Sequence, residues 1–234
     1  AILIFYFLEN NFHFLLLRAF QSRHIIKMVM LFKITDLEYS YGVQCILKKQ
    51  NINFKEGHHL LISGPSGCGK TTLMNLMAGL LVPDSGNIFF REKNLCLMSE
   101  KQLDELRAKN FGFIFQKLHL ISHLNIDQNI EIGCPNREQN NLFNIINDLG
   151  LSEKRKQKVR DLSLGEAQRV AIARSLIKNP KVIFADEPTS SLDDLNTSKV
   201  MDLLFLQAKK NNTSLVVSSH DFRIKKFFTN VIEL

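Results

Sequence analysis

The sequence predicts an α/β fold that contains a parallel β-sheet. The runs Lys181–Ala185 and Ser214–Ser218 are almost continuously apolar, as is typical of strands that are buried on both faces of such a sheet. Segments with the character of strands alternate with segments of helical periodicity, which indicates an α/β protein. A glycine-rich loop, residues 64–72, also lies between a predicted strand and a predicted helix, an arrangement that is common in this class.

The first part of the chain is predicted to be rich in strands. Residues 31–63 hold short apolar stretches that are broken by Tyr41-Gly42 and Glu56-Gly57, and such breaks are typical of turns between strands. The first strand is expected at Phe32–Tyr39. The run Leu60–Ile62 indicates a buried strand directly before the glycine-rich loop.

Helices and further strands are predicted after that loop. One helix follows the loop and is expected to end near Gly79, and Val82–Gly86 is expected to form a turn. Phe111–Phe115 is predicted to be a short strand. The apolar residues from Leu142 to Leu149 keep a helical period, and Gly150 is expected to end that helix.

The N-terminal residues are predicted to lie outside the folded domain. Met28 and Met30 stand just before the first predicted strand, so our hypothesis is that residues 1–27 precede the true start of the protein. The alternative is a weak membrane-associating arm, because this stretch is apolar but lacks the unbroken run of about 18 residues that a transmembrane helix needs. We therefore expect a non-domain extension over residues 1–29 and a single domain over residues 30–234.

The composition is that of a globular protein, and its positive charge suits an anionic ligand or an acidic membrane surface without proving either. Hydrophobic residues make up 45% of the chain, charged residues 23%, and the net charge is +7. The densest basic run, Lys154–Arg160, is interpreted as a solvated face. Nucleic acid is not expected as a partner, because the run lacks neighbouring aromatic or groove-reading residues.

The cysteines argue against a metal centre and against a disulfide framework. Four are present, and none forms a C-x-x-C pair; they are Cys45, Cys68, Cys96 and Cys134. Such isolated cysteines favour a reducing compartment.

The glycine-rich loop fits the phosphate-binding pattern G-x-x-x-x-G-K-[ST] at every fixed position. The candidate nucleotide-binding residues of this loop are Gly64, Pro65, Ser66, Gly67, Cys68, Gly69, Lys70, Thr71 and Thr72. Glycines let backbone N–H groups wrap around a phosphate, and the following helix N-terminus adds a favourable dipole. Lys70 is expected to reach the β- and γ-phosphates and Thr71 to bind Mg²⁺. A plain turn before a helix is the alternative.

Two adjacent carboxylates follow the apolar strand that begins at Val182. Neighbouring strand residues point to opposite sides, so Asp186 and Glu187 are expected to take different roles. One would hold Mg²⁺ through its water shell, and the other would orient and deprotonate an attacking water. The alternative interpretation is a polar strand end that is capped by a turn.

A capping box marks the start of a later helix. Ser163 and Glu166 have the S-x-x-E spacing that fixes a helix N-terminus. The free N–H groups and dipole there would provide a second anion site. An amphipathic helix with a cap and no ligand is the alternative.

These motifs together resemble the nucleotide-binding subunit of an ATP-binding-cassette (ABC) transporter over residues 31–234. The segment Leu162–Glu166, followed by Gln168–Arg174, is similar to the signature sequence of that family. The resemblance implies a P-loop NTPase fold of ABC type, with a mixed sheet core and an N-terminal antiparallel β part. It also implies a helical signature subdomain at about residues 117–161.

The resemblance assigns roles to individual residues. It implies that Tyr41 stacks on adenine and that Gln116 contacts Mg²⁺ and senses the membrane partner. Asp186 corresponds to the metal-binding carboxylate and Glu187 to the group that activates water. His220 corresponds to the histidine that contacts the γ-phosphate.

The resemblance also implies an assembly and a location. Two copies, or this chain and a paired cassette, would close head to tail around two ATP molecules with Mg²⁺. Ser163 and Gly165, with Glu166, would grip the γ-phosphate that the other copy holds, and Ser190–Asp193 would cross the dimer interface. The partner would be an integral membrane permease, and the chain would be cytoplasmic, peripheral on the inner face of the cell membrane.

One residue departs from the family pattern. Leu164 stands where the family usually has glycine, and leucine would be strained there if that position needed a positive φ. If Leu164 abolished turnover, the chain would have a purely structural or binding role. Retention of Ser163 and Gly165 favours activity.

Within the family, the motifs are most similar to those of the bacterial lipoprotein-releasing, macrolide-export and cell-division group. This similarity rests on Arg107–Gln116 and Ala185–Thr189. An ATPase of an amino-acid importer is the alternative within the transporters. A non-transport ABC ATPase acting on DNA or ribosomes is disfavoured, because the segment between Lys70 and Ser163 leaves no room for a long coiled coil.

Overall fold

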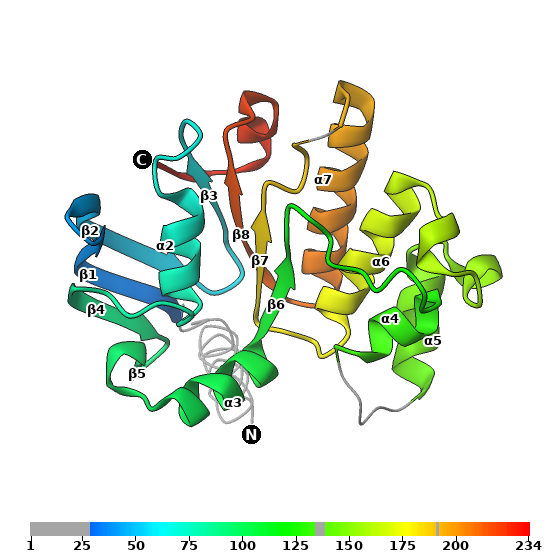
Figure 1. Cartoon of the computed structure of the whole chain (residues 1–234), viewed down its shortest axis with the longest axis horizontal. Coiled ribbons are helices and arrows are strands. Elements are labelled where there is room, and N and C mark those ends of the chain that lie inside the picture. Colours follow the sequence, from blue (N-terminus) through cyan, green and yellow to red (C-terminus); the bar gives the residue numbers. More distant parts are fainter. Residues whose placement is uncertain (1–28, 134–138, 191) are drawn as a thin grey trace, which may run out of the picture.

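The computed structural model describes residues 29–133, 139–190 and 192–234 (Figure 1). The strands are β1 (Met30–Tyr41), β2 (Gln44–Lys55), β3 (His59–Ser63), β4 (Ser85–Phe90), β5 (Lys93–Asn94), β6 (Phe111–Ile114), β7 (Val182–Asp186), β8 (Ser214–Ser219) and β9 (Asn230–Glu233). The α-helices are α2 (Lys70–Met77), α3 (Glu100–Asn110), α4 (Ile126–Glu131), α5 (Gln139–Asp148), α6 (Leu164–Leu176) and α7 (Asp194–Lys210). The expectation about residues 1–27 lies outside the described residues.

The strands form two sheets, one parallel and one antiparallel, so the core sheet that the resemblance implied as mixed has parallel pairs among the described strands. One sheet has the strand order β6-β7-β8-β3-β9, and its strand pairs are parallel. The other has the order β2-β1-β4-β5, and its pairs are antiparallel. In Figure 1 the antiparallel sheet and α2 lie on one side of the parallel sheet, and α6 and α7 lie on the other. The predicted α/β class is therefore confirmed.

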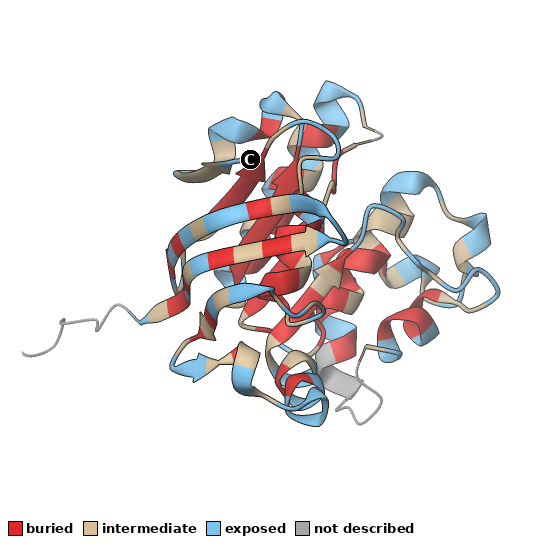
Figure 2. Ribbon diagram, turned by 60° about the vertical axis from the view of Figure 1, so that its left-hand side comes forward, coloured by how far each residue is buried: buried red, intermediate tan, exposed pale blue. Residues whose placement is uncertain are grey.

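Alternation along the parallel strands divides the interior into two apolar clusters. Val182 and Phe184 of β7 pack into the cluster that holds the antiparallel sheet and α2. Ile183 and Ala185 point the opposite way, into the cluster that holds α4 to α7. All four side chains are fully buried, which explains the continuous apolar run in the sequence, and Figure 2 shows the buried sheet between its two covering layers. Burial of a side chain such as Phe184 contributes about 1.5–3 kcal/mol.

Two long helices were not predicted individually from the sequence. Helix α3 begins with a capping box in which the Ser99 side chain accepts from Gln102 N–H and the Gln102 side chain accepts from Ser99 N–H. Helix α7 begins where the Asp193 side chain accepts a hydrogen bond from Asn196 N–H. The residues of the α3 capping box and the N-cap aspartate of α7 were therefore present in the sequence. The apolar period of both helices is weak, because α3 has few apolar residues and α7 carries exposed leucines, Leu195 and Leu206, as well as buried ones.

The predicted turn at residues 82–86 is shorter than expected. Strand β4 already begins at Ser85, which pairs with Glu38 of β1. The turn is therefore confined to the residues before Ser85. Glycine and serine are common in turns, but here the neighbouring strand provides pairing partners for them.

The helical part that was predicted at about residues 117–161 contains α4 and α5. Two short 3₁₀ turns follow them, at Ser152–Lys154 and Val159–Asp161. The apolar side chains of α4 and α5 share one buried cluster with α6 and the parallel sheet. Within residues 29–133, 139–190 and 192–234, no helix is both long and apolar enough to span a bilayer.

Candidate functional site

The predicted phosphate loop and the predicted carboxylates meet at one edge of the parallel sheet. Strands β3, β7 and β8 are neighbours and run parallel, so their carboxyl ends lie side by side. The loop follows β3, Asp186 ends β7, and His220 follows β8. Ligands of open α/β sheets bind at such carboxyl ends.

Two glycines of the loop have backbone conformations that other residues rarely adopt. Gly67 and Gly69 have φ values of 81° and 106°, in the region that disfavours other residues. A Cβ atom on Gly69 would lie 2.8 Å from Cγ2 of Ile46. Gly69 occupies the cap position of α2 and has no side chain that could accept from the first N–H groups of the helix. Those groups are therefore available to an anion.

Lys70 places a buried cation inside the loop. Its side chain is 6% exposed, and Nζ lies 3.6 Å from Glu187 Oε1. The same Nζ donates to the carbonyl oxygens of Gly64 and Pro65 at 3.0 and 2.9 Å. Because these partners are loop carbonyls and one carboxylate, the positive charge stays at the centre of the loop, where a phosphate chain would need it.

Asp186 and Thr71 form a pair of oxygen ligands. Thr71 Oγ1 donates to Asp186 Oδ2 at 2.9 Å, and Ser218 Oγ donates to Asp186 Oδ1. Among the described residues, no group of three or more His, Cys, Asp and Glu side chains could hold a metal ion. A site with one carboxylate and one hydroxyl fits Mg²⁺, which keeps several waters and takes phosphate oxygens as further ligands.

Glu187 lies beyond the end of β7 and has a left-handed backbone. Its φ is 46°, and a non-glycine residue in this region costs about 1–3 kcal/mol. The Glu187 N–H donates to Ser218 O at 2.9 Å, and Ser219 Oγ donates to Glu187 Oε2 at 2.9 Å. Asp186 and Glu187 therefore have different hydrogen-bond partners. This turn of the backbone separates them, in place of the expected strand alternation, and their different roles stay predictions.

His220 contacts the same carboxylate from the next strand. Its Nδ1 lies 2.9 Å from Glu187 Oε1, and its backbone N–H donates to that oxygen at 3.1 Å. A carboxylate oxygen accepts, so Nδ1 carries the hydrogen in this contact. The ring is 53% exposed, so His220 can contact both Glu187 and a ligand in solvent.

Tyr41 and Gln116 lie at the rim of this edge. Tyr41 ends β1, and its exposed ring contacts Tyr39 edge to face, with the ring centres 5.0 Å apart. The hairpin of β1 and β2 approaches the phosphate loop through Ile46 and Gly69. The exposed Gln116 follows Ile114, which pairs with Ala185. This register puts Gln116 at the same sheet edge as the two carboxylates.

The predicted capping box at the start of α6 is present. Ser163 Oγ accepts from Glu166 N–H at 3.3 Å, and Glu166 Oε2 accepts from Ser163 N–H at 2.8 Å. The hydrogen bond from Lys154 and the bond from the Ser163 backbone lower the pKa of Glu166 to about 2. Leu164 is the first helical residue, exposed and outside the left-handed region, so the strain considered for it does not arise. Gly165 follows it on the first turn.

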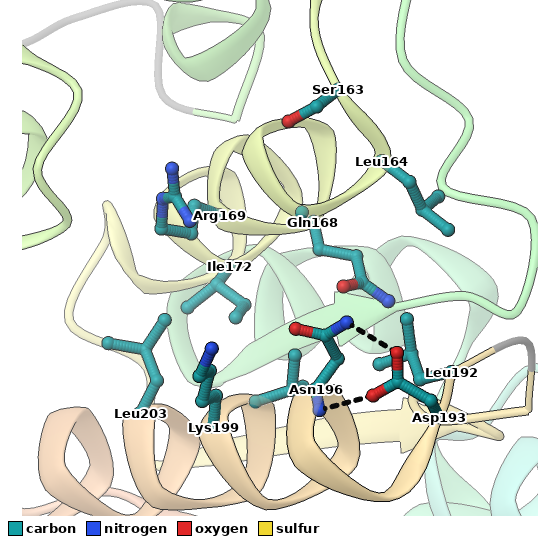
Figure 3. A pocket seen from close by; sticks show the side chains of 12 residues that line it. Ser163, Leu164, Gln168, Arg169, Ile172, Leu192, Asp193, Asn196, Lys199 and Leu203 are labelled. Carbon is teal, nitrogen blue, oxygen red and sulfur yellow. Dashed lines mark hydrogen bonds between the residues drawn. The ribbon is translucent and has the colours of Figure 1, made fainter.

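A cavity of about 460 Å³ adjoins this turn, between α6 and α7. Figure 3 shows Ser163 and Leu164 near one end of it, with Gln168 and Arg169 of α6 opposite Lys199 of α7. The sequence did not predict this cavity, because it depends on how two distant helices pack. It is therefore a feature of the tertiary structure alone.

Arg223 is a further residue near the site that the sequence did not indicate. It donates from Nη2 to Asp221 Oδ2 at 2.7 Å, and Nη1 contacts Asp194 at the start of α7. Nη2 also donates to Leu192 O at 3.2 Å. The Arg223 guanidinium holds the pKa of Asp221 below its usual value. In the segment 190–193, Ser191 lies outside the described residues. Arg223 thus joins the residues after His220 to the predicted interface loop.

Comparisons with known proteins agree with this arrangement. The sequence profile of the ABC transporter family matches residues 47–190. The lipoprotein-releasing system ATP-binding protein LolD of Leptospira interrogans is 35% identical over 193 residues, which cover 80% of this chain and 81% of that protein. The putative hemin import ATP-binding protein HrtA of Staphylococcus haemolyticus is 35% identical, with 81% and 88% covered.

Solved structures are similar as well. The dimeric ATP-binding cassette MJ0796, solved in a post-hydrolysis state with ADP and Pi, matches with a TM-score of 0.76 and 31% identity. The match covers 87% of this chain and 94% of that one. The likeness therefore extends over almost the whole described part of the chain.

Proposed function

The chain belongs to the ABC transporter family as an ATP-binding and ATP-hydrolysing subunit, and we propose that it powers a separate permease of the lipoprotein-release or macrolide-export type. The observation that carries the proposal is the meeting of Lys70, Glu187 and His220 at the edge of the sheet where the phosphate loop lies. A cation, a carboxylate and a histidine at that point are suited to transfer of a phosphoryl group to water.

The chain's own residues suggest how hydrolysis would proceed. The loop N–H groups and Lys70 would hold the β- and γ-phosphates and stabilise the charge that develops on them. Glu187 would accept the proton of the attacking water, and His220 would hold the γ-phosphate from the other side. Thr71 and Asp186, with Gln116, would hold Mg²⁺, which when bound neutralises phosphate charge.

The second half of each nucleotide site would come from another copy. Ser163 and Gly165 lie on a different element from the phosphate loop, at the exposed start of α6. A head-to-tail dimer would place this turn on the γ-phosphate that the partner holds, and Tyr41 would stack on the adenine. The dimeric state of the similar MJ0796 cassette supports this arrangement.

The membrane partner is the finer part of the proposal. The similarity to LolD proteins of several bacteria supports a lipoprotein-releasing permease, with this chain peripheral on its cytoplasmic side. The likeness to HrtA, which is named for putative hemin import, keeps a second candidate open, an ATPase that serves a permease for import.

Hydrolysis tests the catalytic part. We expect Glu187→Gln to lower ATP turnover by roughly 10²–10⁴-fold, the range for loss of a general base, while ATP still binds. Glu105→Gln, which changes an exposed carboxylate of α3, is the matched control and should leave turnover unchanged. Full turnover by Glu187→Gln would contradict the proposed role.

Co-purification tests the partner. The Glu187→Gln chain, expressed in the native organism, would be isolated from detergent-solubilised membranes in the presence of ATP. A permease with few spans and a large extracytoplasmic domain would support the lipoprotein or macrolide type. A compact multi-span permease with a solute-binding protein would support import, and ribosomes or DNA without a membrane protein would contradict a transport role.

A further inference from the structure

The basic run Lys154–Arg160 is mostly exposed, as the sequence predicts, but most of its cations are also paired with carboxylates. Arg155 and Lys156 both contact Asp127 of α4, at 3.0 and 3.1 Å. Lys154 turns to a different element, where its Nζ donates to Oε1 of Glu166 in the first turn of α6. The run therefore links α4 to α6, and Lys154 makes the contact with the signature turn.

Glu166 is bonded on both of its oxygens. Oε1 accepts from Lys154, and Oε2 accepts from the Ser163 N–H at 2.8 Å. The Glu166 side chain is 14% exposed, whereas that of Lys154 is about half exposed. Lys154, Glu166 and Ser163 therefore form a continuous chain of contacts that ends on the turn expected to bind phosphate.

The Glu166 carboxylate places a negative charge in the turn that is expected to bind phosphate. Its pKa is about 2, so it is ionised at neutral pH. The resemblance placed Glu166 with Ser163 and Gly165 in the grip on the γ-phosphate. Its negative charge, within one helical turn of them, instead repels an approaching phosphate, and partial burial strengthens that repulsion. The helix dipole offsets only part of it. A cation that pairs with Glu166 removes most of the net charge.

We infer that Lys154 is a positioning residue for ATP turnover, which neutralises Glu166 and holds its carboxylate on the Ser163 N–H so that the turn accepts the γ-phosphate of an ATP bound by a second copy. This inference rests on the proposed head-to-tail dimer. Lys154 acts through its contact with Glu166 and not through a contact with the nucleotide. Its effect is therefore on how the closed dimer binds ATP.

Steady-state kinetics of the full chain test the inference. We expect Lys154→Met to raise the ATP concentration for half-maximal hydrolysis by roughly twofold to fivefold, the upper part of the range for an exposed ion pair. Affinity of the separate chains for a fluorescent ATP analogue should not change, because the phosphate loop is untouched. Lys154→Arg keeps the cation and should restore the wild-type value.

A matched variant tests whether loss of any positive charge from this basic run has the same effect as Lys154→Met. Lys158→Met removes one positive charge from the same run, and Lys158 is exposed. It should leave both measurements unchanged. Urea unfolding of all variants establishes that each is folded, and a shift with Lys158→Met equal to that with Lys154→Met would overturn the inference.

A double-mutant cycle separates positioning from a general structural role. Glu166→Gln removes the charge but keeps a side chain able to cap Ser163. In that background Lys154→Met should have no further effect. An equal effect in both backgrounds would overturn the inference alone. Failure of the Glu187→Gln chain to dimerise with ATP would overturn the proposed dimer and this inference with it.

Discussion

Among single residues, the site depends on backbone conformations that few side chains tolerate. Glu187 has a left-handed φ of 46° and carries the predicted general base. Gly69 has a φ of 106°, and the absence of a Cβ atom lets the loop pass close to Ile46. Such strain persists only where surrounding contacts determine it, and here the contacts of Ser218 and Ser219 hold Glu187 in place.

Gly69→Ala tests the loop. The new Cβ would meet Ile46 at 2.8 Å in a conformation that disfavours alanine, so we expect a loss of more than about 1 kcal/mol of stability and weak ATP binding. Gly57→Ala is the control, because Gly57 also has a positive φ but a Cβ added there would meet no atom within 4 Å. Stability from urea unfolding and affinity from nucleotide titration check both. Unchanged ATP affinity in Gly69→Ala would show that the loop tolerates the clash.

Among the helices and strands, the caps and the loops that follow strands position the chemistry. The Ser163 cap fixes the start of α6, and the Asp193 cap fixes the start of α7. Arg223 lies in the 3₁₀ helix Phe222–Phe227 and binds Asp194 at the start of α7. The segment after His220 and the helix after the predicted interface loop are therefore joined by one side chain.

Arg223→Ala is expected to cost about 1–3 kcal/mol of stability, because the mostly buried Asp221 loses its guanidinium partner. ATP turnover should fall as well, because the Leu192 carbonyl oxygen loses the hydrogen bond from Arg223 that links its loop to the segment after His220. The control Lys225→Ala removes the exposed pair with Glu233 and should cost at most about 1 kcal/mol. Urea unfolding and hydrolysis rates measure the two effects. ATP turnover equal to that of the wild type would show that the hydrogen bond between Arg223 and Leu192 has no part in catalysis.

In the molecule as a whole, the parallel sheet separates two apolar clusters and brings the site together at one edge. Phe184 lies at the centre of one cluster, with ring centres 6.1 Å from Phe32 and 5.2 Å from Phe111. These aromatic contacts join β1 of the antiparallel sheet to β6 and β7 of the parallel sheet. The two sheets are therefore expected to unfold together.

Phe184→Ala is expected to destabilise the protein by about 3–5 kcal/mol, the usual range for truncation of a buried phenylalanine. Asp186 ends the same strand and Glu187 comes directly after it, so ATP hydrolysis should also fall. Phe222→Ala, at an 81% exposed position, is the control and should stay within about 0.5 kcal/mol. Thermal and urea unfolding check both. A loss below about 1 kcal/mol in Phe184→Ala would contradict the role of this cluster.

Features that depend on contacts between neighbouring residues could be predicted from the sequence alone. The phosphate loop, the capping box of Ser163 and Glu166, and the buried strand ahead of Asp186 were all predicted from contiguous residues and are present in the structure. Loops and caps are set by residues within one turn of each other. The weak period of α3 and α7 explains why these helices were not predicted separately. The roles of the site residues stay predictions, as does the assignment of residues 30–234 to one domain.

Contacts between distant groups, in contrast, depend on how the chain packs in three dimensions. Thr71 bonds Asp186 across 115 residues of sequence, and Lys154 of the helical part bonds Glu166 of α6. The position of Glu187 on Ser219 and His220 likewise depends on β7 and β8 lying side by side. No local pattern specifies such contacts, because they arise when packing of the two clusters fixes the register of the sheet and the places of α6 and α7.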